Sequence, residues 1–208
     1  IGVTARARLA SHMLIEEFMI AANVAAASEL AGHGQPCLFR VHDKPDPVRL
    51  EALAEFLEHL GVPWSRTAKK PGDFTRLLQN LAEHELREMV STFVLRAQAQ
   101  AVYSPRNIGH FGLNLKLYAH FTSPIRRYPD LLVHRAIKHV LSGRKPSSFR
   151  YSTNDMAALA LQCSERGRRA DEAEREVDER YRAAWMEQHV GGEFAGVISG
   201  VTSFGLFV

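Results

Sequence analysis

Apolar residues recur at helical spacing in the first part of the chain, from about Arg6 to Leu30. The recurring apolar positions are Leu9, Met13, Phe18, Ala22 and Ala25, and few helix breakers interrupt them, which predicts a long helix. His12, Glu16 and Asn23 fall on one face of this helix, because residues four and eleven positions apart lie on the same side. This polar face is either solvated or lines a groove, and its apolar flanks favour the groove.

The pattern in the middle of the chain predicts shorter elements. A strand is expected over 36–42, and three helices are expected over 46–61, from residue 71 onward and over 88–101. A loop-and-strand region is expected over 103–121, where Leu113, Leu115 and Leu117 alternate with other residues. The first of these helices has the clearest bounds, with Asp46 as N-cap, Pro47 at the first helical position and Gly61 at the end. We expect these helices to be scaffold.

The stretch Thr122–Asp130 reads Thr-Ser-Pro-Ile-Arg-Arg-Tyr-Pro-Asp and carries the most chemical information. Ser123 followed by Pro124 is typical of a helix start, which would put Arg126 and Arg127 in a first helical turn. Two guanidiniums there oppose the helix macrodipole, so they indicate that an anion such as phosphate binds at this point. The alternative is a surface turn with two solvated arginines.

Helical and strand patterns also fill the rest of the chain. Pro129 lacks an N–H and favours a helix that begins there and ends near Gly143. Residues 155 to about 189 predict one long charged helix with Glu and Arg at helical spacing. Residues 192–208 alternate apolar with small residues, which predicts β-strands. The expected fold class is therefore α+β, mostly helical with a few strands.

Composition adds few constraints. A formal net charge of +3 over 208 residues permits a nucleic-acid partner without requiring one. Glu16, Glu17 and Asn23 interrupt the most apolar early run, so we expect no signal peptide, no membrane partner and a cytoplasmic protein. Cys37 and Cys163 lack a partner motif and are expected to be isolated thiols. The ten histidines lack the short paired spacings of a zinc site.

The sequence contains a distinctive set of motifs in this order: residues 14–23, 101–104 with 107–113, Tyr118–Arg135, which reads YAHFTSPIRRYPDLLVHR, and 170–175. Together these motifs resemble the RNB catalytic domain of the ribonuclease II and R family. The tail from Glu193 to Val208 resembles the opening strands of the OB-fold RNA-binding domain that follows in this family. We therefore expect residues 1–190 to be the C-terminal portion of an RNB domain and 191–208 a truncated OB fold. Both ends of the sequence indicate a fragment of a longer protein.

The resemblance implies a 3′→5′ exoribonuclease that uses magnesium to hydrolyse single-stranded RNA processively to nucleoside 5′-monophosphates. Arg126 matches the catalytic arginine that neutralises charge on the scissile phosphate. The expected substrate-binding residues are Glu16, Glu17, Asn23, His120, Arg127, Glu174, Phe204 and Phe207. Glu16, with Glu17 as the competing candidate, would contact the terminal ribose. Phe204 and Phe207 would stack on bases. A core role in the barrel is the alternative for each, and more so for Phe207, because residues three apart on a strand point to opposite faces.

One family feature is missing from the sequence. The family holds its metal with a cluster of aspartates, whereas the aspartates here stand singly: Asp43, Asp46, Asp73, Asp130, Asp155, Asp171 and Asp178. We therefore expect no metal site within these residues, magnesium ligands upstream of them, and no activity of this chain alone. The alternative function is a non-catalytic RNA-binding protein that keeps the RNB scaffold. A helical module without an RNA role would leave Arg126, Arg127 and the polar helix face unexplained.

Overall fold

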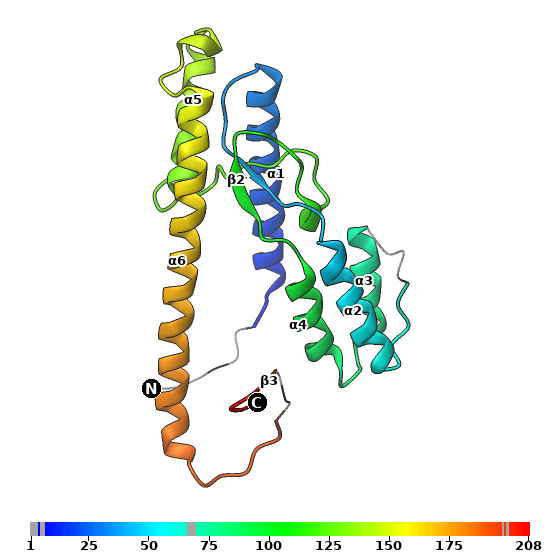
Figure 1. Cartoon of the computed structure of the whole chain (residues 1–208). Helices are drawn as coiled ribbons and strands as arrows, with labels where there is room; N and C mark the ends of the chain where they lie inside the picture. The colour runs from blue at the N-terminus through cyan, green and yellow to red at the C-terminus, as the bar shows by residue number, and fades with distance from the viewer. Residues whose placement is uncertain (1–3, 5–6, 66–69, 197, 199) are drawn as a thin grey trace. The chain divides into compact units, whose positions relative to one another are not determined.

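The computed structural model describes residues 4, 7–65, 70–196, 198 and 200–208 (Figure 1). The fold is mixed and mostly helical with a few short strands, which confirms the predicted fold class. In chain order the elements are α1 (Ala10–Gly32), β1 (Phe39–Val41), α2 (Pro47–His59), α3 (Pro71–Asn80), α4 (Arg87–Ala97), β2 (Val102–Ser104), η1 (Phe111–Leu113), α5 (Tyr128–Leu141), η2 (Pro146–Ser148), α6 (Thr153–Met186), η3 (Glu187–His189), β3 (Gly200–Thr202) and β4 (Gly205–Phe207).

Two compact units make up the chain. One is Arg8–Gly167, and the other contains Arg168–Val208. Helix α6 contributes its first half to one unit and its second half to the other. The predicted domain boundary at residues 190 and 191 stays a prediction. Within the described residues, no helix is both long and apolar enough to span a membrane.

Helix α1 confirms the first predicted helix but buries a different face from the predicted apolar one. Its buried residues are Asn23, Ala26, Ala27 and Leu30, all in the C-terminal half. Leu9, Met13 and Phe18 from the predicted stripe are 53%, 44% and 62% exposed. The reason is that the buried half of α1 packs against α5, in a core shared with Val133 and Ala136. Arg6, where the helix was expected to begin, lies outside the described residues.

Strands β1 and β2 pair antiparallel, with Phe39 opposite Ser104 and Val41 opposite Val102. β1 is shorter than the predicted strand over 36–42 because β2 offers three residues for pairing. Next to this pair, Leu38, Leu132 and Met156 are fully buried in a cluster that joins the start of α6 to α5. Leu38, next to β1, thus packs in one cluster with residues of α5 and α6.

Helices α2, α3 and α4 lie together and have a hydrophobic core of their own (Figure 1). Leu57 and Val90 are fully buried in this core, and Phe56 stacks on Phe93 with ring centroids 3.7 Å apart. The predicted cap is confirmed, since the Asp46 carboxylate accepts from the backbone N–H groups of Val48 and Arg49.

The predicted strand through Leu113, Leu115 and Leu117 is wrong. The segment forms the single turn η1, followed by Asn114 in the left-handed conformation at φ 54°. The buried His42 ring accounts for the bend, because its Nδ1 accepts from the Gly112 N–H at 2.7 Å. A Cβ at position 112 would lie 2.9 Å from that nitrogen, so only glycine lets the backbone approach so closely.

The unit that contains Arg168–Val208 ends in the hairpin of β3 and β4, in which Gly200 pairs with Phe207. Phe204 lies in the turn of this hairpin and Phe207 in β4. The assumption that both belong to one strand and point to opposite faces is therefore wrong. Their rings meet edge to face with centroids 6.1 Å apart, and both are exposed.

Candidate functional site

The nine-residue motif forms a turn before α5. The backbone N–H groups of Arg126 and Arg127 both donate to the Ser123 carbonyl, at 3.3 and 3.0 Å. The next helix begins at Tyr128, so the prediction that Ser123 and Pro124 open a helix is wrong. Pro129 explains the difference, because it has no N–H to donate and is tolerated only in a first helical turn. The dipole argument for an anion therefore does not apply to Arg126.

Arg126 lies at the exposed end of this turn. Its neighbour Ile125 is fully exposed, and within the described residues the Arg126 guanidinium has no hydrogen bond or ion pair. The turn thus presents a guanidinium to the surroundings.

Arg127 points into the protein instead. Its Nη2 lies 2.8 Å from Oδ1 of Asp130, in an ion pair whose side chains are 22% and 0% exposed. Oδ1 of Asp130 also accepts from the backbone N–H of Ser123 at 2.7 Å. Arg127 was predicted to bind substrate, and the structure finds its guanidinium engaged with a buried carboxylate.

Asn23 holds the segment that leads into the turn. Its Oδ1 accepts from the backbone N–H groups of Phe121 and Thr122, at 2.8 and 3.2 Å, and its Nδ2 donates to the Tyr118 hydroxyl at 3.0 Å. The side chain is 2% exposed. From α5, Nε2 of His134 donates to the Phe121 carbonyl at 2.9 Å while its ring stacks on Phe121. Asn23 was predicted to bind substrate, and its contacts are those of a buried anchor.

His120 lies half-buried beside Tyr103 of β2. Its Nδ1 is 2.8 Å from the Tyr103 hydroxyl, and the Arg40 guanidinium lies 4.7 Å from the centre of the Tyr103 ring. Burial, followed by the positive charges of Arg127, Arg40 and Arg126, lowers the pKa of His120 to about 3. The ring is therefore neutral near pH 7 and shares a hydrogen bond with the tyrosine hydroxyl.

Three arginines lie near enough to His120 for their charges to lower its pKa. The three guanidiniums that depress the pKa of His120 belong to β1 and to the Arg126 turn. Within this group the Asp130 carboxylate is buried and pairs with Arg127. The remaining field is positive, so the surface at the turn attracts an anion. We call Arg40, Tyr103, His120, Arg126 and Arg127 the arginine cluster.

The other predicted site residues lie on α1 or in the unit that contains Arg168–Val208. Glu16 is exposed on α1 and forms an ion pair with Arg8. Glu17 is also exposed, and both stand about 10 Å along the helix axis from Asn23 at 1.5 Å per residue. Glu174 is exposed on the part of α6 that belongs to the unit with Arg168–Val208. Phe204 and Phe207 belong to the same unit and are also exposed.

Sequence reasoning missed Asp130, Arg40 and Tyr103. A signal for Asp130 was present, because it stands three residues after Arg127 and in the first turn of a helix opened by Pro129, where a carboxylate is favoured. Arg40 and Tyr103 carry no local signal, since they meet through the pairing of β1 with β2. Their role depends on a contact between residues far apart in the chain.

The described residues do not fit a magnesium site. Among them, no group of three or more His, Cys, Asp or Glu side chains is arranged to hold a metal ion. Asp130 is paired with Arg127, and a second positive charge beside the carboxylate disfavours a bound cation. Burial raises the pKa of the Cys37 thiol to about 12, and that of Cys163 is also raised, so both thiols stay protonated.

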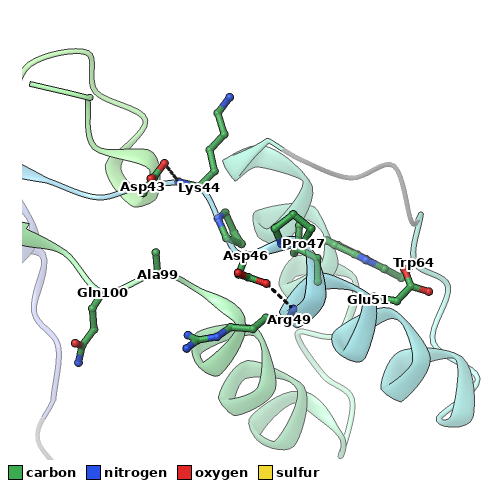
Figure 2. Close-up of a pocket in the computed structure, with 11 residues that line it drawn as sticks. Asp43, Lys44, Asp46, Pro47, Arg49, Glu51, Trp64, Ala99 and Gln100 are labelled. Carbon is green, nitrogen blue, oxygen red and sulfur yellow. Dashed lines mark hydrogen bonds between the residues drawn. The ribbon is translucent and has the colours of Figure 1, made fainter.

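A pocket of about 850 Å³ lies elsewhere, between the start of α2 and the segment that follows α4 (Figure 2). Asp46 on its wall is used as the cap of α2, and Arg49 donates to the Gln98 carbonyl. Trp64 lies at its far side and packs against Phe74. Charges of both signs line the pocket, and it contains none of the predicted site residues.

The comparison with protein families decides the assignment. A model of the RNB domain matches residues 1–143. The chain belongs to the RNB domain family. Ribonuclease R of Vibrio parahaemolyticus is 45% identical over 208 residues, a match that covers 95% of this chain and 25% of that protein. The chain thus spans about a quarter of the length of the curated relatives it matches.

Solved structures agree with this RNB assignment. The apo form of Mycoplasma genitalium RNase R superposes with a TM-score of 0.86 at 25% identity, covering 95% of this chain and 32% of that one. The same enzyme in complex with ribose methylated single-stranded RNA gives a TM-score of 0.82 at 26% identity, with the same coverage. The resemblance inferred from the motifs is confirmed.

Proposed function

We propose that this RNB chain is part of a ribonuclease R-like 3′→5′ exoribonuclease that hydrolyses single-stranded RNA processively in the cytoplasm, with nucleoside 5′-monophosphates as products. The match of an RNB family model and the 45% identity to a ribonuclease R support the enzyme class. The complex of the Mycoplasma genitalium enzyme with single-stranded RNA supports the substrate. The alternative, a non-catalytic RNA-binding protein, predicts binding without hydrolysis by the full-length protein.

The observation that carries the proposal is the exposed guanidinium of Arg126 on a firmly anchored turn. Asn23, His134 and Asp130 fix the backbone at Phe121 and Ser123, which leads into the turn, so the guanidinium can be held in place before a substrate arrives. A preorganised positive group is most effective where charge develops during the reaction. We therefore assign Arg126 to the scissile phosphate, where it neutralises charge in the transition state.

Replacing Arg126 by lysine in the full-length enzyme tests this role. Lysine keeps the charge but loses the planar fork that binds two phosphate oxygens. We expect Arg126→Lys to lower kcat about 10²-fold, comparable to the loss of one oxyanion-hole donor, while the Kd for single-stranded RNA changes less than about threefold. Single-turnover kinetics and equilibrium RNA binding measure the two quantities.

A matched control is Arg144→Lys, which changes an exposed arginine beyond the end of α5. Both its kcat and its Kd are expected to match those of the wild type. An equal loss of kcat and RNA affinity in Arg126→Lys would contradict a transition-state role and favour simple phosphate binding.

Other residues complete the proposed RNA path. We assign Glu16, or else Glu17, to a contact with the terminal ribose. Glu174 is assigned to the last nucleotide, and His120 to the wall of the RNA channel. Residues 1–190 are proposed as the C-terminal portion of the RNB domain and 191–208 as the start of an OB fold. The exposed rings of Phe204 and Phe207 support base stacking there.

Magnesium is assigned to the intact enzyme, with ligands outside these 208 residues. The described residues offer no donor set for it, so none of the roles above depends on a metal contact from this chain.

A further inference from the structure

The carboxylate of Asp130 links the two halves of the Arg126 turn. Its Oδ1 accepts from the Ser123 N–H at 2.7 Å and from Arg127 Nη2 at 2.8 Å. Ser123 in turn accepts from the N–H groups of Arg126 and Arg127 through its carbonyl. Asp130 therefore holds the residue that begins the turn and the residue that ends it, on either side of Arg126.

Asp130 is itself fixed. It lies in the first turn of α5, where the helix macrodipole favours a negative charge, and it is fully buried. A buried carboxylate is stable when it is paired and hydrogen-bonded, and Arg127 and Ser123 supply both needs. The pair of Asp130 and Arg127 is thus fixed to α5 through Asp130 and bonded to the turn through the Ser123 N–H.

We propose that Asp130, together with Arg127, is a positioning residue that orients Arg126 toward the scissile phosphate. This inference rests on the proposed function of Arg126. It also gives Arg127 a role different from direct substrate binding, because its guanidinium is used to complete the buried pair. The two adjacent arginines of the motif then divide their work, with Arg126 acting on the substrate and Arg127 on the turn.

The two oxygens of Asp130 differ in a way that permits a clean test. Oδ1 accepts both bonds, while Oδ2 is buried and has no hydrogen-bond partner within the described residues. In Asp130→Asn, an amide NH₂ can take the place of Oδ2 while the amide oxygen keeps the bond from Ser123. The substitution has nearly the same shape, so it removes the charge opposite Arg127 without removing the backbone contact.

The experiment is a double-mutant cycle between positions 130 and 126 in the full-length enzyme, measured by single-turnover hydrolysis of single-stranded RNA. Asp130→Asn is expected to lower kcat about tenfold or more, with KM changed less than about threefold. In the Arg126→Ala background the same substitution is expected to lower kcat less than about twofold, because a positioning residue has no effect once the group it positions is gone.

Asp155→Asn is the matched control. Asp155 also lies in the first turn of a helix, where its carboxylate accepts from the Ser152 N–H and hydroxyl, and it is exposed. Its kcat and KM are expected to equal those of the wild type. If Asp130→Asn fails to fold, Arg127→Lys disturbs the same pair from the other side, and the same cycle with Arg126→Ala applies.

The outcomes separate the two ideas. If Asp130→Asn lowers kcat by the same factor with and without Arg126, Asp130 does not act through Arg126 and the inference is overturned. If Arg126→Ala alone leaves kcat unchanged, the proposed function of Arg126 fails. A large effect of Arg126→Ala with no effect of Asp130→Asn and of Arg127→Lys rejects the positioning role only.

Discussion

At the scale of single residues, Asn23 shows how one buried amide can hold a backbone segment that is distant in sequence. Its side chain bonds to two backbone N–H groups and one hydroxyl of a segment 95 to 99 residues away. It stands on the same face of α1 as His12 and Glu16, which are exposed. One helix face therefore serves two purposes, with an anchor in its buried half and solvated side chains in its exposed half.

Asn23→Leu tests the anchor. Leucine has a similar size but leaves the part-buried N–H groups of Phe121 and Thr122 without their acceptor. We expect the free energy of unfolding to fall by about 2–4 kcal/mol, since each unpaired buried polar group costs about 1–3 kcal/mol. Urea unfolding of the chain followed by circular dichroism measures the change.

The control is Asn154→Leu, on the exposed first turn of α6, for which a change within about 0.5 kcal/mol is expected. Equal destabilisation by both substitutions would show that Asn23 is not an anchor.

The residue types of the site were readable from the sequence, but their partners were not. Arg126 and Arg127 are adjacent residues of the same type, and the sequence pattern predicted that both bind an anion. The difference between them arises because Arg127 meets a carboxylate that packing has fully buried. Local sequence signals contain the spacing of Arg127 and Asp130 but not the burial that decides their interaction.

At the scale of elements, β2 and the segment before the Arg126 turn are joined by the hydrogen bond between Tyr103 and His120. The imidazole in this bond is neutral near pH 7, because the pKa of His120 is strongly lowered. Burial holds the folded-state pKa of His120 at about 3, whereas an unfolded histidine titrates near 6.5. The folded state therefore resists protonation of this ring.

The consequence is a pH dependence of stability. Above pH 6.5 the ring is neutral in both states and the contact contributes fully. As the pH falls from 6.5 toward 3, the unfolded state binds a proton that the folded state does not, so the free energy of unfolding decreases. We expect the urea midpoint of the chain to decline over this range, and less steeply in His120→Gln.

His110 contributes to the same decline, because its folded-state pKa is also lowered, to about 4. Some slope will therefore remain in His120→Gln. A slope identical to that of the wild type would refute the assignment of a depressed pKa to His120.

Elements with local signals were predicted well. The helix after Asp46 has its cap, its first-turn proline and its apolar repeat within the element, and the structure confirms it. The helix expected to open at Ser123 and Pro124 does not form, whereas the helix predicted from Pro129 begins within one residue of it, at Tyr128. The strand expected through Leu113 to Leu117 failed because the ring of His42, distant in sequence, bends that backbone.

At the scale of the whole molecule, the chain is expected to bind RNA weakly and not to hydrolyse it by itself. Incubation of the 208-residue chain with poly(A) and magnesium should release no nucleoside monophosphates, because the described residues lack a donor set for the metal. Chromatography of the products measures the release, with the full-length enzyme as positive control. Clear release of nucleotides by the pure chain would overturn this account of where the metal ligands lie.

The family assignment needed the whole molecule as well. Single motifs such as Ser123-Pro124 or two adjacent arginines are common, and only their order along the chain resembled the RNB family. The match of the RNB family model to residues 1–143 confirms that reading. The aspect that no sequence pattern contained is the anchoring of the Arg126 turn by α1 and α5.

The pairing of β1 with β2 has a consequence for the order of folding. The two strands enclose residues 42–101, a stretch that contains α2, α3 and α4 with their separate core. Closing a long flexible loop is entropically unfavourable, and contacts between distant residues slow folding. If the three helices collapse first, they bring Val41 and Val102 close before the strands pair. The enclosed helices would then act as a folding nucleus for the pairing of β1 with β2, although none of them contributes a residue to that pairing.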